Sequence, residues 1–350
     1  MILFMHNIFT HNNLNRERTS QNKKLELKLK QNKKQKEGEI ILKRILQQLC
    51  LLLVLLISLA VVSGCIGEDD NHGHGDATGN YAALNESALN QIKSGEKILV
   101  AVSVVPQSEF VEKVGGDKVV AISMIPQGAG HHYDPSPRQI EDLSNANMYV
   151  ALGSGEIFET THMNSFTQIN PTMKIVNSSA GIKLIVNGNT SDPHVWTSPK
   201  NAQIMVENIC EGLAELDPAN ATYYEQNRDN YLTELTSLDS EVSNELSNLS
   251  NRNFMVYHPA WSYFAKDYQL NQIAAEIDGK EPTPKTLSKF IDLAKENNIT
   301  VIFVQEQVSK TSAEAIAESV GAEVFVVDPL AKDYVNNTKY VANALAENLS

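Results

Sequence analysis

Cysteine is scarce in this chain, which excludes a fold held together by disulfide bonds. The sequence has three cysteines among 350 residues. Cys50 lies inside an apolar run near the N-terminus and Cys65 closes that run, so Cys210 stands alone in the remainder. A disulfide framework requires several pairs. Cys210 lies in a segment with helical periodicity, and we interpret it as a small buried hydrophobic residue.

The sequence also lacks the common motifs of nucleotide binding and zinc proteolysis. Neither a P-loop nor a His-Glu-x-x-His run occurs. Gly153-Ser154-Gly155 follows a predicted strand, but Phe158 stands where the third glycine of a dinucleotide-binding motif would be. An isolated match of this kind is weak, so we interpret the stretch as a tight turn.

Basic residues are few once the N-terminal extension is set aside. Residues 1–64 hold 11 of the 29 Lys and Arg but only 4 of the 42 Asp and Glu. The other 18 basic and 38 acidic residues give a formal net charge of −20, against −13 for the whole chain. A chain this acidic repels nucleic acid and attracts cations. We therefore expect no nucleic-acid partner.

No apolar run is long enough for a comfortable transmembrane helix. The longest, residues 49–62, follows Lys43 and Arg44 and has the length of the hydrophobic region of a secretory signal peptide. It ends in Val-Ser-Gly-Cys at Cys65, which resembles the lipobox of prokaryotic lipoproteins. That resemblance implies cleavage before Cys65 and a lipid on its sulfur, which would anchor the protein to the outer face of the cytoplasmic membrane. An uncleaved anchor or a buried helix is the alternative.

Two N-terminal regions stay outside the predicted fold. Residues 1–64 are interpreted as an extension followed by a lipoprotein signal peptide. Residues 65–96 are predicted to be a flexible polar tether, because Gly, Asp and Asn dominate its first half. His72 and His74 in this tether could collect metal near a main site, or they could be incidental.

From residue 97 onward, apolar runs alternate with helical segments, which predicts an α/β fold. In an N-terminal lobe, residues 97–218, strands are predicted at 97–105, 119–125, 148–152 and 174–176, and helices at 108–114, 137–145 and 201–215. Alternation of this kind favours a parallel sheet covered on both faces. His162 falls in a polar stretch, which we expect to be an exposed loop.

A long helix is predicted at residues 219–250, between the two halves of the fold. Its apolar residues recur mostly every three or four positions and form one stripe, made of Tyr224, Tyr231, Leu235, Leu238, Val242, Leu246 and Leu249. Such a helix is longer than one lobe needs, so we interpret it as a spine packed across two lobes. A C-terminal lobe, residues 251–350, repeats the α/β pattern, with strands near 254–257, 272–276, 301–304 and 324–327 and helices at 283–297 and 312–320.

Four side chains that can bind a metal stand at comparable places in the two predicted lobes. His131, His258 and Asp328 each follow a predicted strand, and His194 precedes the helix at residues 201–215. Ligands bind at the carboxyl ends of strands in open α/β sheets, so a cleft between the lobes could hold all four. Three imidazoles and one carboxylate suit tetrahedral Zn²⁺, although Mn²⁺ or Fe²⁺ could also be accepted.

Each of these residues also has a structural interpretation. A single His beside an aromatic residue is more often structural than a metal ligand. Seven His follow Cys65, however, and three of them stand at comparable strand ends or turns. His132 competes with His131 for the first position. Asp328 precedes Pro329 and could simply shape a turn.

Five short motifs surround these residues. They are His-His-Tyr-Asp-Pro-Ser-Pro-Arg from His131, Asp-Pro-His-Val-Trp from Asp192, Tyr-His-Pro-Ala-Trp from Tyr257, Glu-Ile-Asp-Gly-Lys-Glu-Pro from Glu276 and Asp-Pro-Leu from Asp328. Together they make nearly all of the folded part resemble the zinc- and manganese-binding lipoproteins of ABC transporters, the cluster A-I solute-binding family.

The resemblance implies two Rossmann-like lobes with parallel sheets, joined by a long rigid helix, with the metal in the interdomain cleft. It places the ligands on His131, His194, His258 and Asp328. Manganese-type members tend to have a carboxylate at the third position, so His258 favours zinc.

The sequence departs from the family's pattern in two places. Residues 128–130 are shorter than the Gly-Ala-x-Pro stretch that usually precedes the first ligand, which keeps His132 as an alternative. The histidine-rich loop that many zinc members carry before the second motif is missing, and His72 and His74 could substitute for it.

These features predict a lipid-anchored, extracytoplasmic monomer that captures one Zn²⁺ and hands it to an ABC transporter permease driven by its ATPase. Binding and release would make and break no covalent bond, so we do not expect an enzyme. A manganese- or iron-binding protein of the same importer class is the first alternative. A zinc-dependent hydrolase is another, with Glu276, Glu281 and Glu306 as conceivable bases, and a surface adhesin or metal buffer is the last.

Overall fold

The alternation of strands and helices continues through the whole folded part of the chain. The computed structural model describes residues 84–350 apart from 189, 275–283 and 306–309. The described residues all belong to one compact unit, His74–Ser350. None of the helices in this described part has both the length and the apolar character needed to span a membrane.

Each half of the described chain is built on a parallel four-stranded sheet. The first sheet has the order β2-β1-β3-β4, from strands β1 (Ile98–Val104), β2 (Val119–Ile125), β3 (Met148–Ala151) and β4 (Lys174–Asn177). The second has the order β10-β9-β7-β8, from β7 (Asn253–Val256), β8 (Asn271–Ala274), β9 (Val301–Val304) and β10 (Glu323–Val326). The predicted α/β class with two parallel sheets is confirmed.

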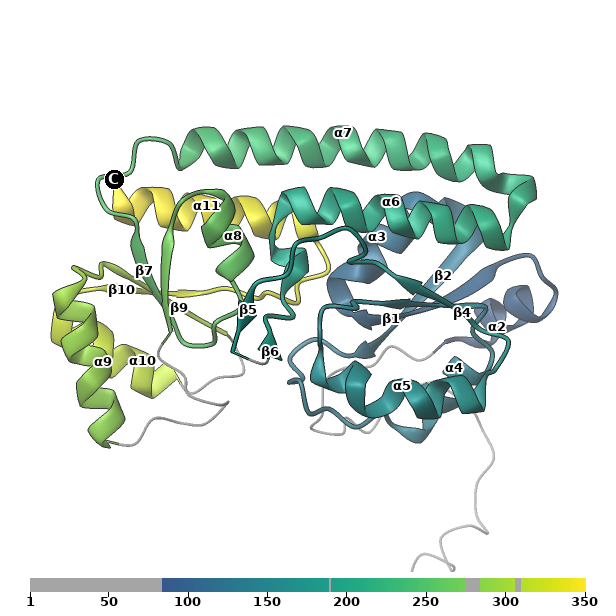
Figure 1. Cartoon of the computed structure of the whole chain (residues 1–350), viewed down its shortest axis with the longest axis horizontal. Helices are drawn as coiled ribbons and strands as arrows, with labels where there is room; N and C mark the ends of the chain where they lie inside the picture. Colours follow the sequence, from purple (N-terminus) through teal and green to yellow (C-terminus); the bar gives the residue numbers. More distant parts are fainter. Residues whose placement is uncertain (1–83, 189, 275–283, 306–309) are drawn as a thin grey trace, which may run out of the picture. The chain divides into compact units, whose positions relative to one another are not determined.

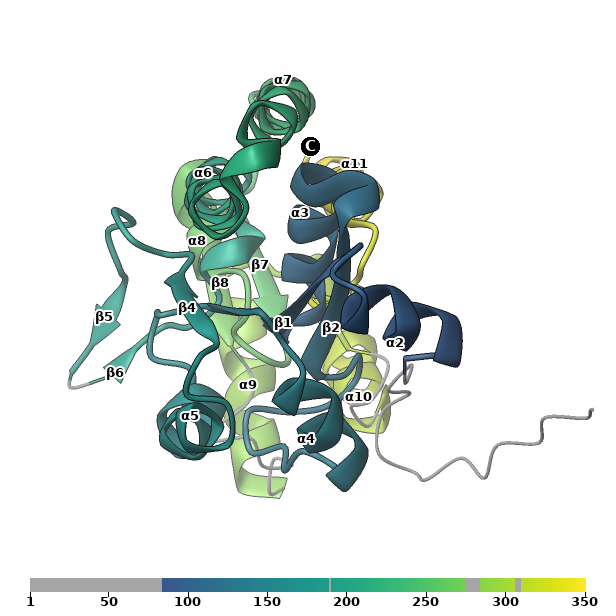
Figure 2. The same cartoon turned by 90° about the vertical axis from the view of Figure 1, so that its right-hand side faces the viewer.

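Helices cover both faces of each sheet, as parallel strands require. Figures 1 and 2 show α3 and α6 on one face of the first sheet and α4 and α5 on the other. In the second half, α8 and α11 lie on one face and α9 and α10 on the other. The helices are α2 (Glu86–Lys93), α3 (Val105–Gly115), α4 (Pro137–Ser144), α5 (Ile157–Ile169), α6 (Pro199–Leu216), α7 (Ala221–Glu245), α8 (Ser262–Asp267), α9 (Pro284–Glu296), α10 (Lys310–Val320) and α11 (Tyr334–Leu349).

Short elements complete the chain. Three turns of 3₁₀ helix occur at η2 (Gly116–Lys118), η3 (Val195–Thr197) and η4 (Pro218–Asn220) among the described residues. A small antiparallel hairpin joins β5 (Val186–Asn187) to β6 (Thr190–Ser191).

Alternate residues of β7 face two separate hydrophobic cores. Phe254 and Val256 belong to a core that continues through α7 and the first sheet. Met255 and the adjoining Tyr257 belong to a smaller core beneath α9 and α10. Side chains on a strand alternate between its two faces, so one strand serves both cores. The larger core joins the two halves of the molecule.

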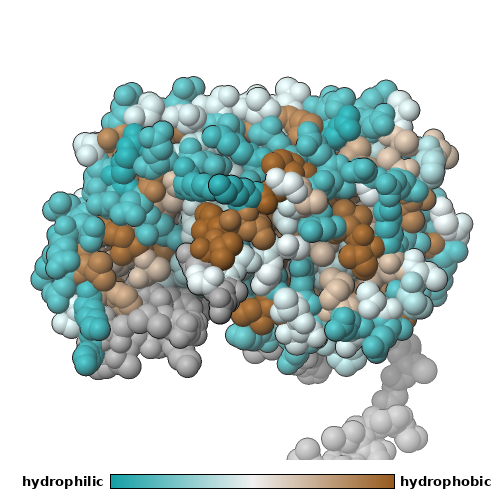
Figure 3. Space-filling model, viewed as in Figure 1, coloured by the Kyte–Doolittle hydropathy of each residue, from teal (hydrophilic) through white to brown (hydrophobic). Residues whose placement is uncertain are grey.

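The long helix α7 lies across both halves. The residues of its predicted apolar stripe are buried from Tyr224 through Leu246, and they pack on α3, α6 and α11. Figure 3 shows hydrophilic residues over its outer side. The helix is shorter than the predicted 219–250, because η4 precedes it and it ends at Glu245. Ser and Asn in residues 247–251 favour turns over continued helix.

Four described helices, α2, α5, α8 and α11, lie where the sequence predicted none. His162 was expected in an exposed polar loop, which is wrong, because it lies on α5 with a side chain only 19% exposed. Its ring stacks on Phe166 and also contacts Phe158. These three rings recur every four residues, which was the helical signal in the sequence. Helix α2 likewise falls inside the range 65–96 that was predicted as a tether.

Candidate metal centre

Three imidazole rings from distant parts of the sequence meet at one point. His258 Nε2 lies 3.2 Å from His131 Nε2 and 3.1 Å from His194 Nε2. The ligand atoms of all three lie within 4.8 Å of one another, and they form the one such group of His, Cys, Asp or Glu found in the part of the chain that the structure describes. Tetrahedral Zn–N bonds of about 2.0–2.1 Å would place the nitrogens roughly 3.3 Å apart. The spacing of the rings therefore fits a tetrahedral ion.

Two of the rings lie just beyond the carboxyl ends of parallel strands. His131 follows β2, and His258 follows β7 by two residues. The backbone N–H of Tyr257 donates to the carbonyl of Phe303 at 2.8 Å, so the chain stays aligned with β9 up to the histidine. The carboxyl edges of parallel sheets are where open α/β folds bind ligands.

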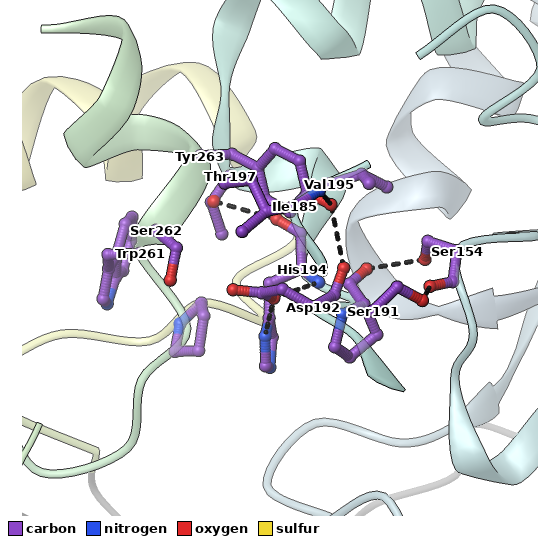
Figure 4. A network of polar contacts seen from close by, with 12 residues as sticks. Ser154, Ile185, Ser191, Asp192, His194, Val195, Thr197, Trp261, Ser262 and Tyr263 are labelled. Atoms are coloured by element: carbon purple, nitrogen blue, oxygen red, sulfur yellow. Dashed lines mark hydrogen bonds and ion pairs between the residues drawn. The ribbon is translucent and has the colours of Figure 1, made fainter. Parts of the chain in front are cut away.

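The third ring is fixed by the turn that opens η3. The backbone N–H of His194 donates to Asp192 Oδ1 at 3.0 Å. The carbonyl of His194 accepts from the Thr197 N–H at 3.2 Å and from the Thr197 hydroxyl at 2.9 Å. The residue is 5% exposed. Its backbone is thus held on both sides, as Figure 4 shows.

A buried carboxylate orients His131. Both oxygens of the fully buried Glu156 lie 2.9 Å from His131 Nδ1. Glu156 follows a turn in which Gly155 has a φ of +97°, where an added Cβ would also collide with the Ser191 side chain. Burial raises the pKa of Glu156, but the hydrogen bond and charge of His131 outweigh it and the pKa is lowered overall. The carboxyl group is therefore ionised at neutral pH.

A second carboxylate orients His194 in the same way. Asp192 Oδ1 lies 2.8 Å from His194 Nδ1, and Figure 4 shows the two side chains pointing at each other. Burial raises the pKa of Asp192, but the hydrogen bonds that it accepts from the ring and the backbone of His194 help to outweigh burial, so the pKa is lowered. The pKa of His194 is also lowered, because its burial disfavours the imidazolium more than Asp192 favours it. A neutral imidazole thus faces an ionised carboxylate.

The two carboxylates decide which ring nitrogens face the centre. An ionised carboxylate only accepts hydrogen bonds, so Nδ1 of His131 and Nδ1 of His194 carry the hydrogen. In a neutral ring, Nε2 then holds a lone pair. Two lone pairs therefore converge beside His258, and such lone pairs repel one another and attract a cation. Histidines that bind metals commonly donate their other N–H to a carboxylate.

Asp328 lies beyond the end of β10 but is not part of the three-imidazole group. Its Oδ2 accepts from Gln127 Nε2 at 2.6 Å, and its Oδ1 accepts from the Leu330 N–H at 2.8 Å. The exposed His132, the alternative first ligand, is not in the group either. A ligand role for Asp328 stays a prediction.

Several residues singled out in the sequence lie outside the described residues. They are the lipidation site Cys65, the tether histidines His72 and His74, and the conceivable bases Glu276, Glu281 and Glu306. Nothing in the structure bears on their roles.

The residues that orient the imidazoles were not predicted. Asp192 had a local signal, because it stands two residues before His194 with a proline between them. Glu156 had none, since it lies 25 residues from His131 and meets it through the pairing of separate strands. Gln127 was missed because its partner, Asp328, lies 201 residues away and follows a strand of the other sheet.

The fold and the centre define a two-lobed α/β binding protein with three histidines gathered at strand ends. Residues 100–348 match the family described as zinc-uptake complex component A, periplasmic (ZnuA). The chain belongs to this family, which confirms the resemblance drawn from the motifs.

Individual relatives agree with the family match. The high-affinity zinc uptake system protein ZnuA of Bacillus subtilis is 30% identical over 255 residues, covering 67% of this chain and 79% of that protein. A crystal structure of ZnuA superposes with a TM-score of 0.69 at 41% identity, covering 73% of this chain and 100% of that one. A zinc-bound ZnuA deletion mutant gives a TM-score of 0.68 at 41% identity, covering 73% and 98%.

Proposed function

We propose that this protein captures Zn²⁺ outside the cytoplasm and delivers it to an ABC transporter for import. The observation that carries the proposal is the convergence of three ring nitrogens, two of them aimed by buried carboxylates. His131, His194 and His258 would bind the ion, and a water molecule or Asp328 would fill the fourth position. Family membership supplies the context of zinc uptake.

Zinc is favoured over manganese by the donor atoms. Mn²⁺ prefers carboxylate, carbonyl and water oxygens, whereas imidazole nitrogen suits Zn²⁺, which also lies later in the affinity order. Three imidazoles at a spacing that fits tetrahedral bonds therefore favour Zn²⁺. The manganese or iron alternative has no comparable support.

A hydrolase is disfavoured by the state of the carboxylates at the centre. Zinc hydrolysis needs a general base beside an open metal position. Glu156 and Asp192 are each engaged by an imidazole N–H, so neither is free to take a proton from a water molecule. As far as the described carboxylates that orient the imidazoles go, this favours a binding protein that makes and breaks no covalent bond.

The decisive experiment is metal analysis of the purified protein and two histidine variants. We expect one Zn²⁺ per chain that excess Mn²⁺ does not displace. His194→Ala should lose this zinc, while His132→Ala, which changes an exposed neighbour of the centre, should retain it. Preferential binding of Mn²⁺ would make the protein a manganese carrier, and an absence of stoichiometric metal would refute the proposal.

The location and partners complete the proposal. The lipobox-like end of the apolar run favours a lipid on Cys65 and attachment to the outer face of the cytoplasmic membrane. A monomer would then dock on the permease, whose ATPase drives import. Labelling cells with a radioactive fatty acid tests the anchor. The wild type should carry label and sediment with membranes, and Cys65→Ser should do neither.

A further inference from the structure

The turn that carries His194 is held from both halves of the molecule. From the first half, the Ser154 hydroxyl donates to the Pro193 carbonyl at 2.8 Å. From the second half, the turn is approached by Ser262 and Tyr263, the first two residues of α8. Figure 4 shows both of them beside the turn. The contacts that α8 makes here reach the Asp192 residue that orients the ring.

The hydroxyl of Tyr263 is inserted between the two strands of the β5–β6 hairpin. Val186 pairs with Ser191, so the next pair along the hairpin is Ile185 with Asp192. Such a pair would exchange two backbone hydrogen bonds. One is present, from the Asp192 N–H to the Ile185 carbonyl at 2.9 Å. In place of the other, the Ile185 N–H donates to the Tyr263 hydroxyl at 3.0 Å, which donates to the Asp192 carbonyl at 2.9 Å.

The direction of this hydrogen-bonded chain is fixed by its two ends. The Ile185 N–H can only donate and the Asp192 carbonyl can only accept, so the hydrogen of the Tyr263 hydroxyl points at the carbonyl. Tyr263 is 3% exposed, and burial raises its pKa, so the hydroxyl keeps that hydrogen. Because two bonds in series replace one, the hydroxyl holds the hairpin open at Asp192. The opening lies just where the chain turns toward the metal centre.

The neighbouring Ser262 holds the side chain of the same aspartate. A hydrogen bond from Ser262 reaches the Asp192 carboxylate and helps to lower its pKa. The Ser262 hydroxyl oxygen accepts from Gln272 Nε2 at 2.9 Å, and Gln272 Oε1 accepts from the Trp261 N–H at 2.7 Å. Gln272 lies on β8, so this contact is anchored in the second sheet. Asp192 is therefore held at its backbone and at its carboxylate by a single turn of α8.

We propose that Tyr263 is a positioning residue that sets the direction of the Asp192–His194 pair from the second half of the molecule. This inference rests on the zinc site proposed above. Tyr263 follows His258 by five residues, so one short segment delivers the third imidazole and also orients the second. The packing of α8 against the hairpin is thereby coupled to the geometry of the metal centre. An ion finds these two imidazoles correctly placed only while that packing is intact.

The test removes the hydroxyl and keeps the ring. Loss of an imidazole's direct partner typically costs about 10–100-fold in metal affinity, and Tyr263 acts one contact further out. We therefore expect Tyr263→Phe to weaken zinc binding by roughly three- to tenfold, measured by competition with a zinc-binding dye. The visible absorption of the Co²⁺-loaded variant should also change, because a displaced His194 alters the geometry around the ion.

Tyr268→Phe is the matched control. Tyr268 follows the last residue of α8, is 5% exposed, and donates its hydroxyl to Asp239 Oδ1 on α7 at 2.8 Å. The control loses a buried hydroxyl from the same part of the chain, without a contact to Asp192. It should lower the free energy of unfolding in urea. Its zinc affinity should stay within about twofold of wild type, with an unchanged Co²⁺ spectrum.

Two further variants trace the route through Asp192. In an Asp192→Ala background, Tyr263→Phe should cost less than about twofold in zinc affinity, because residues that act through one another are not additive. Ser262→Ala removes the other contact from α8 and should weaken zinc binding by roughly three- to tenfold. It tests the same turn of α8 if Tyr263→Phe fails to fold.

Three results would overturn the inference while leaving zinc capture intact. The first is unchanged zinc affinity and an unchanged Co²⁺ spectrum in folded Tyr263→Phe, or unchanged affinity in Ser262→Ala where Tyr263→Phe does not fold. The second is an equal loss of affinity in Tyr268→Phe, which would indicate a general effect of stability. The third is full additivity with Asp192→Ala. Failure of the wild type to bind stoichiometric zinc would instead refute the proposed function itself.

Discussion

The two halves of the metal centre hold their carboxylates in different ways. In the first half, Glu156 and Asp192 each accept a hydrogen bond from the Nδ1–H of a histidine that faces the centre. In the second half, Asp328 accepts from the amide of Gln127 and from a backbone N–H. Glu156 and Asp192 orient imidazoles, whereas Asp328 is itself held by hydrogen bonds from other residues.

The difference follows from what burial costs an ionised group. A buried carboxylate persists as an anion only where hydrogen bonds and nearby positive charge outweigh its desolvation. Glu156 and Asp192 meet that condition through the imidazoles, and their pKa values are lowered. In each pair, the carboxylate and the imidazole therefore hold each other in place before any ion binds. The carboxylates of the first half thus prepare the site, and the variants below test that division, from the largest expected effect to the smallest.

Removing the imidazole of the second half should abolish tight binding. The Nε2 atom of His258 lies close to Nε2 of both His131 and His194. His258→Ala therefore removes one of the three ring nitrogens that meet at the centre. Loss of an outer partner alone typically costs 10–100-fold in metal affinity, so we expect a loss of more than about 100-fold here. Competition with a zinc-binding dye measures it. Affinity within tenfold of wild type would mean that His258 is not a ligand.

Neutralising a carboxylate of the first half should have a smaller effect. Glu156→Gln keeps an acceptor near His131 but removes the charge, so we expect zinc affinity to fall by about 10–100-fold. Glu159→Gln is the matched control. Glu159 is buried in the first turn of α5, just after Glu156, but it accepts from the Ser103 hydroxyl and from the N–H groups of Leu152 and Gly153.

The control should lower stability and leave zinc affinity nearly unchanged. Equal losses of affinity in Glu156→Gln and Glu159→Gln would show that any buried charge on this helix matters, and that Glu156 does not act through His131. Isothermal titration on both variants, with urea denaturation as the measure of folding, separates these outcomes.

The strands could be predicted well from the sequence, whereas several of the helices between them could not. Parallel strands buried on both faces are continuous apolar runs, so β1, β2 and β9 were predicted within one residue of their ends. The three histidines stood out because each sits at a strand end or turn. Helix α5 was missed because its apolar spacing is carried by aromatic rings around His162, within an otherwise polar segment.

The residues that orient the ligands could not be predicted from the sequence for a physical reason. Glu156 meets His131 because β2 and β3 both pair with β1. Gln127 meets Asp328 because segments that follow strands of two different sheets approach each other. No periodicity or local motif encodes such a pairing. Strand-end positions could be predicted from the chain, but which of their side chains would touch could not.

Loosening the contact between residues 327–333, which carry Asp328, and the first half should reduce stability more than binding. Trp196→Phe removes the hydrogen bond to the buried Pro329 carbonyl and leaves a smaller ring in a fully buried site. We expect a loss of about 1–3 kcal/mol in the free energy of unfolding. Zinc affinity should change less than in Glu156→Gln.

Trp261→Phe controls for ring size, since Trp261 is also buried and packs edge-on against Phe264. Urea denaturation of both variants gives the comparison. If Trp196→Phe weakens zinc binding as much as Glu156→Gln does, then the loop of the second half prepares the site as fully as the first half, and the contrast between the halves fails.

The smallest effect is expected at Glu109, a partly buried carboxylate whose pKa is raised, whereas those of Glu156 and Asp192 are lowered. It accepts from the Tyr231 hydroxyl at 2.9 Å and from the Tyr334 N–H at 2.7 Å. Burial raises its pKa, and the hydrogen bonds from Tyr334 and Tyr231 and the charge of Lys113 do not outweigh burial. The folded protein therefore holds this proton more tightly than the unfolded chain. Its contribution to stability is complete below the ordinary carboxyl value of 4.5 and is lost as the pH rises through the raised value.

Glu109→Gln should remove that pH dependence. Its free energy of unfolding relative to wild type should rise between pH 4 and neutral pH by less than about 1 kcal/mol, because the group is partly solvated. Glu112→Gln, an exposed partner of Lys332 on the same helix, is the control and should show a flatter difference. Urea denaturation across this pH range measures both. If the stability of Glu109→Gln relative to wild type falls as the pH rises, then the fold stabilises Glu109 as an anion. The kind of hydrogen-bond donor beside a buried carboxylate would then not explain why the pKa of Glu109 is raised while those of Glu156 and Asp192 are lowered.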